Sequence, residues 1–419
     1  MWWSNIRQSG LPGLTRDVTL YLIFSAVFHF GLMGIGDTVL NFYFVSLGYG
    51  SETIGLLQSL PRVGGFLLGL PGGLLANQIG ARRIIIYATM CMAFTYGTLI
   101  IWPTLFMVGL SRFLLGFFFG IVQIAVNPLL VALSPTNYET HVFAYSNVVS
   151  MGAIAIGSVV GGFLPLMAAF VFPDVAKRSG DVAEQSTYVY QVTLAIGGLV
   201  IFFSVLTLLR ISHKDTIPAT TIGAELRGIP FKNLAGLSFP LLVFGFTGGL
   251  TFPFYNLFFR NSFDLSDQAV GAILSLGWLG MALVPLANPW WERNYGRVWG
   301  LGVTMTIAAI GFTGLSTAPT LAISIGFFII AISFRNVMQP LFQPLIMGTL
   351  PPSLHNIASS IGLILWNIGW FSATAVSGVW QATYGFGFIM RVVAIGLIIN
   401  AISIMLIYRN RSAFEAEIA

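Results

Sequence analysis

Only a few charged side chains of this chain lie inside its long apolar segments. These few are the candidates for ion pairing and proton transfer. Of the 14 acidic residues, only Asp37 lies well inside an apolar segment. A carboxylate in such surroundings costs several kcal/mol unless it is paired, hydrated or protonated. We therefore expect Asp37 to have a cationic partner and to be able to take up and release a proton.

Arg62 and Arg112 are the candidate partners of Asp37. Asp37 lies about nine residues before the end of the first apolar segment. Arg62 and Arg112 lie about nine and eight residues after the starts of the second and fourth segments, which enter from the same side. The spacing predicts an Asp37–Arg62 or an Asp37–Arg112 pair. Such a pair is either a static structural ion pair or a switch that opens on protonation.

Two further ionisable side chains, His29 and Arg335, lie in apolar segments. His29 precedes Asp37 by eight residues, about 80° around an ideal α-helix. It is predicted either as polar lining or as a titrating group, because imidazole titrates near neutral pH. Arg335 lies about 16 residues into the tenth segment, and no acidic residue is predicted at that depth. It could contact a carboxylate, phosphate or sulfonate of a substrate, bond to helix carbonyls, or reach Asp37.

The elements that hold these residues are predicted to be membrane-spanning helices. Over 419 residues only 8% are charged and 56% are hydrophobic, whereas soluble domains carry about 25% charged residues. The apolar residues form about a dozen segments, each long enough to cross a bilayer as a helix of roughly 20 residues. The sequence thus predicts an all-α membrane protein with twelve transmembrane helices, approximately over 18–46, 53–76, 84–102, 104–133, 142–170, 188–209, 235–259, 269–291, 298–317, 319–348, 357–381 and 386–408.

The basic residues predict the orientation of the chain and exclude other classes of function. Twelve Lys and Arg residues fall in stretches on the side of the N-terminus, and only Lys177 and Arg178 fall in an opposite loop. The positive-inside rule then places both termini in the cytoplasm. The net charge of +5 is scattered over short loops rather than gathered on one basic face, so no nucleic-acid partner is expected. Cys91 is the only cysteine; no metal-ligand spacing or phosphate loop is found, and no cofactor is expected.

The chain reads as two related halves, 1–210 and 234–419, joined by a cytoplasmic linker at 211–233. An offset of 216 residues aligns Gln123 with Gln339 and Pro128 with Pro344, along with several glycines. Duplicated six-helix halves are typical of secondary transporters, whose substrate site lies near the membrane midplane.

Three motifs resemble the major facilitator superfamily across the whole chain. The first follows the predicted second helix and keeps the family's glycines and basic pair, with Asn77 in place of the usual Asp; its residues are Gly73, Asn77, Gly80, Arg82 and Arg83. A looser second-half copy comprises Glu292, Arg293, Gly296 and Arg297. Arg112-x-x-x-Gly116 resembles a motif whose arginine is linked to proton coupling in the family, and 157–162 resembles the antiporter motif with Ser158 in place of Pro. The resemblance implies the family's fold of two pseudo-symmetric six-helix halves.

The resemblance implies that helices 1, 4, 7 and 10 line the cavity, and we add three residues of helix 11 as candidates. The resemblance therefore implies a set of substrate-binding candidates beside Arg335. Their amides would orient a substrate by hydrogen bonds and their aromatic rings would supply apolar contact, although some of the amides would only join helices. They are Asn41, Tyr43, Gln123, Asn127, Tyr255, Asn256, Asn336, Gln339, Gln343, Trp366, Asn367 and Trp370.

The expected function is secondary active transport of a small organic molecule by alternating access, driven by protons. Efflux of lipophilic compounds is favoured, using Asp37 and the aromatic residues. A carrier of organic anions or anionic-headed lipids, using Arg335 and Arg112, is the alternative, and a non-transporting membrane sensor is a distant one. A membrane enzyme is not expected, because the four His residues are scattered and a single acid is intramembrane. We expect a monomer in the bacterial inner membrane, with substrate, protons and lipid as its partners.

Overall fold

The computed structural model describes residues 12–172, 182–212, 231–350 and 354–409. These residues form helices and connecting turns, without a strand. Nine stretches among them have the length and hydropathy of a membrane span, and many large apolar side chains are exposed, as expected for lipid contact (Phe170 is 85% exposed). The chain is an integral membrane protein. Most of the predicted linker at 211–233 lies outside the described residues. Lys177 and Arg178 also lie outside them.

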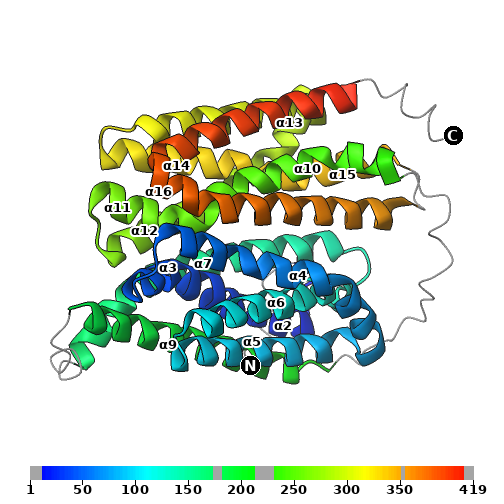
Figure 1. Ribbon diagram of the computed structural model, residues 1–419. Coiled ribbons are helices and arrows are strands. Elements are labelled where there is room, and N and C mark those ends of the chain that lie inside the picture. The colour runs from blue at the N-terminus through cyan, green and yellow to red at the C-terminus, as the bar shows by residue number, and fades with distance from the viewer. Residues whose placement is uncertain (1–11, 173–181, 213–230, 351–353, 410–419) are drawn as a thin grey trace. The chain divides into compact units, whose positions relative to one another are not determined.

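The helices follow one another in the order shown in Figure 1. The first half contains α2 (Arg16–His29), η1 (Phe30–Gly36), α3 (Asp37–Ser46), α4 (Ser51–Ile79), α5 (Ala81–Ile101), α6 (Leu105–Leu133), α7 (Glu139–Val171) and α9 (Val182–Leu209). The second half contains α10 (Phe231–Thr251), η2 (Phe252–Phe254), α11 (Tyr255–Phe263), α12 (Asp267–Leu283), η3 (Val284–Ala287), α13 (Asn288–Thr317), α14 (Leu321–Asn336), α15 (Met338–Met347) and α16 (His355–Arg409).

The chain divides into two compact units that follow the predicted halves except for two exchanged segments. Unit 1 comprises Met1–Tyr49, Leu60–Thr220 and Asp264–Ser275, and unit 2 comprises Gly50–Ser59, Thr221–Phe263 and Leu276–Ala419. Within unit 1 the Tyr190 hydroxyl of α9 donates to Asp267 of α12 at 2.8 Å. Within unit 2 the start of α4 packs on α16, where Gly55 lies against Gly378.

Four of the predicted continuous helices are interrupted, including the eighth, where the 3-10 turn η3 lies between α12 and α13. The first consists of α2, the π-helix η1 and α3; the seventh consists of α10, the 3-10 turn η2 and α11; and the tenth breaks at Val337 between α14 and α15. Proline explains the breaks in the seventh, eighth and tenth helices, because it lacks an N–H and leaves the carbonyl four residues earlier without its helical donor, as Pro285 does for Met281 in the eighth. Pro253 frees the carbonyl of Gly249 in this way, and Pro340 frees that of Asn336.

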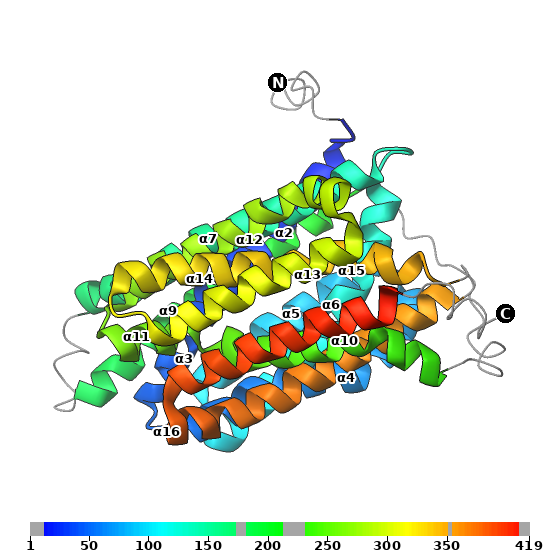
Figure 2. The same cartoon turned by 90° about the horizontal axis from the view of Figure 1, so that it is seen from above.

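Side chains of α16 satisfy the carbonyls that the break in the seventh helix frees. Thr374 donates to the carbonyl of Gly249 at 3.0 Å, and Ser377 donates to that of Leu250 at 2.7 Å. Serine and threonine hydroxyls commonly repair interrupted helices in membranes in this manner. α10 and α16 run alongside each other in both views (Figures 1 and 2), so the break is held by its neighbour within unit 2.

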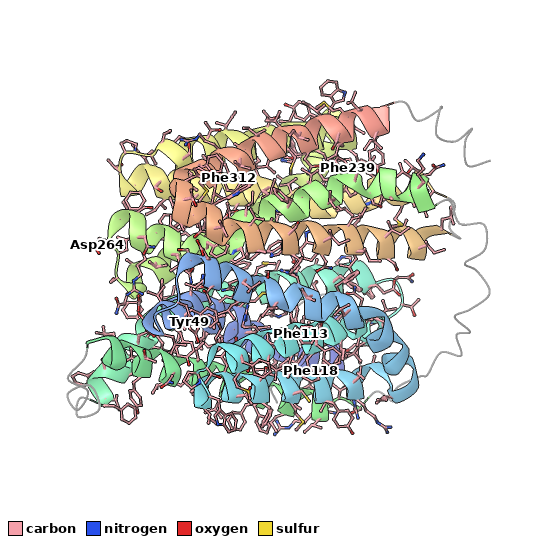
Figure 3. The ribbon with its side chains drawn as sticks, in the orientation of Figure 1. Tyr49, Phe113, Phe118, Phe239, Asp264 and Phe312 are labelled. Carbon is pink, nitrogen blue, oxygen red and sulfur yellow. The ribbon has the colours of Figure 1, made fainter. Side chains whose placement is uncertain are left out.

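Glycines with positive φ reverse the chain inside two long helical stretches. Gly385 has φ 74° and divides α16, and Gly296 has φ 72° within α13. A straight helix as long as α16, with its 55 residues, would extend about 80 Å, well beyond the roughly 30 Å apolar core of a bilayer. Figure 3 labels Phe312, fully buried in unit 2, and Phe239, which is 41% exposed; unit 2 thus has an apolar core and an apolar surface.

Candidate functional site

Unit 1 holds a cluster of charged residues at the junction of η1 and α3. Asp37 is the first residue of α3 and interacts electrostatically with Arg112 of α6 and, more weakly, with Arg62 of α4. The two arginines also repel each other. Both predicted partners of Asp37 therefore belong to one cluster, which holds one carboxylate and two guanidinium groups.

The members of the cluster differ in accessibility. Arg112 is 6% exposed and Arg62 is half-buried, whereas the side chain of Asp37 is exposed between buried helix neighbours. A carboxylate at this depth of a membrane helix is tolerated when it faces protein or water rather than lipid. Asp37 is thus the accessible member of a cluster that is otherwise within the protein.

Tyr96 of α5 is a fourth member that the sequence analysis did not identify. It is 3% exposed and interacts electrostatically with both Asp37 and Arg112. Its hydroxyl lies directly beside Gly36, where an added Cβ would overlap the hydroxyl oxygen. Tyrosines are common in apolar segments, so nothing in the sequence distinguished this one.

Close backbone contacts hold the helices that carry the cluster. The Cβ of an alanine at Gly116 of α6 would overlap the carbonyl oxygen of Pro61, the residue before Arg62. Likewise, an added Cβ on Gly34 of η1 would lie 2.6 Å from the Cα of Gly157 in α7. Small residues allow such approaches between membrane helices, and here they fix the positions from which the charged side chains extend.

His29 is the last residue of α2, directly before η1. Its Nδ1 lies 2.8 Å from the carbonyl oxygen of Ser25, and the Ser25 hydroxyl lies 2.8 Å from that of Ser150 in α7. The predicted offset of about 80° from Asp37 is wrong, because residues 30–36 form a π-helix, whose turn is wider than that of an α-helix. Short π segments of this kind are frequent at functional sites.

Arg335 forms a second site, in unit 2, at the end of α14 next to the break at Val337. It is 6% exposed, its guanidinium lies 3.9 Å from the ring centroid of Phe244, and it donates to the Phe244 carbonyl. The prediction that it could bond to a helix carbonyl is therefore confirmed. Its electrostatic neighbour is Tyr255 rather than an acid.

The remaining substrate-binding candidates have varied surroundings. Gln123, Asn127 and Gln343 are exposed, Asn256 is buried, and Trp370 is 7% exposed. Two of the polar side chains join helices: Tyr43 donates to the carbonyl of Leu99, and Asn336 donates to that of Met281. Asn367 donates to the carbonyl of Leu363 in its own helix. Asn41 is fully buried. The side chain of Gln339 lies outside the described residues.

The conformational motif lies at the end of α4 and the start of α5. Gly73 and Asn77 are in helical backbone, and the side chain of Asn77 lies outside the described residues. Arg82 donates to the carbonyl of Ile211 after α9, while Arg83 is exposed. In the second-half copy, Arg297 pairs with Glu292 at 2.8 Å on a half-exposed surface, and Arg293 is exposed. Exposed pairs of this kind contribute at most about 1 kcal/mol.

Comparison with known sequences identifies a family. The sequence profile described as the Major Facilitator Superfamily matches residues 22–233, half of the chain. Among curated proteins, the quinolone resistance protein NorA of Staphylococcus aureus is 24% identical over 145 residues. That alignment covers 35% of this chain and only 36% of the relative, so the chain matches about a third of NorA's length.

Solved structures share the fold over nearly the whole chain. A bacterial homologue of the human lysosomal transporter Spinster superposes with a TM-score of 0.69 at 15% identity, covering 96% of each chain. The nucleoside transporter NupG gives 0.70 at 16% identity, covering 94% of this chain and 98% of that one. A variant of the E. coli fucose:proton symporter FucP gives 0.63 at 16%, covering 95% and 100%. At such identities the likeness shows the fold alone.

Proposed function

Because the chain belongs to the Major Facilitator Superfamily and is a membrane transporter rather than an enzyme, we propose that it exports lipophilic, drug-like compounds in exchange for protons. The observation that carries the proposal is the cluster of Asp37 with Arg62 and Arg112. An exposed carboxylate beside two arginines, at the junction of a π-helix and an α-helix, can change charge without unfolding anything around it. The similarity to NorA supports efflux as the direction.

In this proposal, protonation of Asp37 couples ion movement to a change of conformation. Ionised Asp37 attracts both arginines and thereby holds α3, α4 and α6 together. When Asp37 takes up a proton, that attraction is lost, while the repulsion between Arg62 and Arg112 remains. The protonated protein therefore favours an arrangement in which the two guanidinium groups separate. Release of the proton to the other side would restore the first arrangement and complete alternating access.

We place the protein in the bacterial inner membrane as a monomer with both termini in the cytoplasm, as the distribution of Lys and Arg indicates. His29 is proposed as a polar side chain of the same pathway, since it lies on the α2 side of η1. A carrier of organic anions or anionic-headed lipids is the second candidate. It is favoured by Arg335, a buried cation whose electrostatic neighbour is a tyrosine.

Transport of a fluorescent lipophilic dye into energised inside-out membrane vesicles tests the proposal. We expect dye uptake when the vesicle lumen is acidified, loss of uptake on adding a protonophore, and at least a tenfold reduction in Asp37→Asn. Glu52→Gln is the matched control, because Glu52 is an exposed acid in the first turn of α4. Uptake that resists the protonophore, or that Asp37→Asn leaves unchanged, would contradict proton-coupled export.

A further inference from the structure

Arg335 is a buried cation that the proton-coupling cluster does not use. It is 6% exposed, and its hydrogen-bond acceptor is the neutral carbonyl of Phe244, which also accepts from the Thr247 hydroxyl at 3.0 Å. The Nε of Arg335 has no acceptor within the described part of the chain. A guanidinium has five N–H donors, so this one retains both charge and donor capacity. Intramembrane charges of this kind mark substrate or ion sites in general.

Unit 2 leaves room for the guanidinium at Gly248. A Cβ at this position would come within 2.5 Å of the Arg335 Nη2 and within 2.7 Å of the Trp370 ring. The missing side chain thus lets the cation and the indole lie side by side against α10. The guanidinium carbon also lies over the Phe244 ring of the same helix, 3.9 Å from its centroid.

Aromatic rings extend from this point to side chains of unit 2 that are partly exposed. The centroid of Phe252 lies 5.7 Å from Trp370, 5.9 Å from Tyr255 and 5.3 Å from Trp278, and Trp366 lies 5.2 Å from Trp370. Tyr255 and Trp370 are buried, whereas Phe252, Trp278 and Trp366 are half-buried. The group therefore has a buried end with a cation and a partly exposed end made of rings. We call these five rings with Arg335 the aromatic site.

The chemistry of the aromatic site selects one class of compound. Planar guanidinium donors match the two oxygens of a carboxylate, and aromatic faces favour a flat ring in an offset or edge-to-face arrangement. A lipophilic cation would be repelled by the positive charge of Arg335. A flexible aliphatic acid would pair its carboxylate with Arg335 but would not use the ring faces.

We propose that the aromatic site binds a flat aromatic carboxylate, with Arg335 holding the carboxylate and the five rings holding the aromatic body. The inference rests on the proposed function, because it names the class of compound that the exporter carries. The bound carboxylate takes the place of the Phe244 carbonyl as the main acceptor for the guanidinium.

Binding to the purified full-length protein in lipid nanodiscs tests the inference, with 2-naphthoate as the probe. Calorimetry should show that 2-naphthoate binds at least tenfold more tightly than 2-naphthamide, which has the same rings without the charge. It should also bind at least tenfold more tightly than decanoate, which has the charge without rings. This comparison uses the wild-type protein and is independent of how any variant folds. Equal binding of naphthoate and naphthamide overturns the inference.

Variants then assign the binding to Arg335. We expect Arg335→Gln to weaken naphthoate binding at least tenfold, and Arg335→Lys, which keeps the charge but not the planar donors, to weaken it less. Arg391→Gln, which removes an exposed arginine from the part of α16 that follows Gly385, is the control and should bind like wild type. Full naphthoate affinity in folded Arg335→Gln overturns the assignment.

The dye assay separates this inference from the proposed function. If proton-driven, Asp37-dependent dye export is seen and naphthoate does not bind, the aromatic-carboxylate inference is wrong and the exporter stands. If naphthoate binds through Arg335 but a proton gradient drives no transport of dye or naphthoate, the binding site stands and the proposed function fails.

Discussion

At the scale of single residues, the proposed function depends on the charge of Asp37, because this carboxylate is attracted by both Arg112 and Arg62. Asp37, Arg62 and Arg112 were expected at one level from residue counts alone, and the structure brings them into one electrostatic cluster. Residue counts could bring the three together because the rise per residue of a helix is nearly constant whatever the neighbours are.

It was harder to predict which residues of other helices contact a given side chain. Tyr96 and Phe244 contact the charged groups from other helices, and their identities depend on packing that one segment does not encode. The sequence left both candidate partners of Asp37 open, and the cluster includes both. It also left three roles open for Arg335, of which the bond to a helix carbonyl is observed.

Gly116 provides a prediction at this scale. We expect Gly116→Ala to destabilise the protein by about 1–3 kcal/mol, because its Cβ would meet the Pro61 backbone. The same substitution would push α4 from α6 and weaken the attraction of Asp37 to Arg62. Thermal unfolding of the purified protein, followed by fluorescence, measures the change.

Gly97→Ala is the control for Gly116→Ala. A Cβ at Gly97 of α5 would have nothing within 4 Å, so alanine should be neutral or should stabilise the helix by up to about 1 kcal/mol. Equal stability of the two variants would show that the contact between α6 and α4 is not close.

At the scale of elements, hydropathy predicted where apolar segments lie but not where their helices break. A π-helix and a 3-10 turn differ from an α-helix in hydrogen-bond register rather than in composition, so η1 carries no hydropathy signal. Pro253, Pro285 and Pro340 were the available signals for the other three breaks. The offset of 216 residues aligns Asp37 with Pro253, so η2 begins at the position equivalent to the last residue of η1. Interrupted helices at equivalent positions are typical of transporter binding sites.

The contact between η1 and α7 provides a prediction for the π-helix. Gly34→Ala and Gly157→Ala should each destabilise the protein by about 1–3 kcal/mol, because the two glycines meet through their Cα atoms. The double variant should lose less than the sum, since the first alanine already separates the helices. Thermal unfolding of the four proteins gives the coupling energy.

Gly152→Ala is the matched control on the same helix, where an added Cβ has open space. It should leave stability unchanged within about 0.5 kcal/mol and should add independently to Gly34→Ala. Strict additivity of Gly34→Ala with Gly157→Ala would mean that η1 and α7 do not touch there.

At the scale of the whole molecule, composition and the long apolar segments predicted a membrane protein, and the family profile and the shared fold support this. The compact units depart from the predicted halves only where a short segment of one half is assigned to the unit of the other half. Asp264–Ser275, which belongs to unit 1, is an example. Such exchanges depend on contacts between distant segments, so neither length nor hydropathy reveals them.

Cysteine labelling tests the proposed orientation. In a Cys91→Ser background, a single cysteine replacing Ser4 or Ser412 should react with a membrane-impermeant maleimide only after cells are permeabilised, because both termini are proposed to be cytoplasmic. A cysteine replacing Ser179, beside Lys177 and Arg178, should react in intact cells. The reverse pattern would invert the proposed topology.

Separating exchange from active transport in proteoliposomes tests the central claim most directly. An imposed proton gradient should drive substrate transport by the wild type, while Asp37→Asn should lose this active transport and retain substrate exchange at equal pH, since alternating access persists without a titrating carboxylate. The reconstituted Glu52→Gln protein should match the wild type in both modes. Proton-driven accumulation by Asp37→Asn at the wild-type rate would contradict the assignment of proton coupling to the Asp37 cluster.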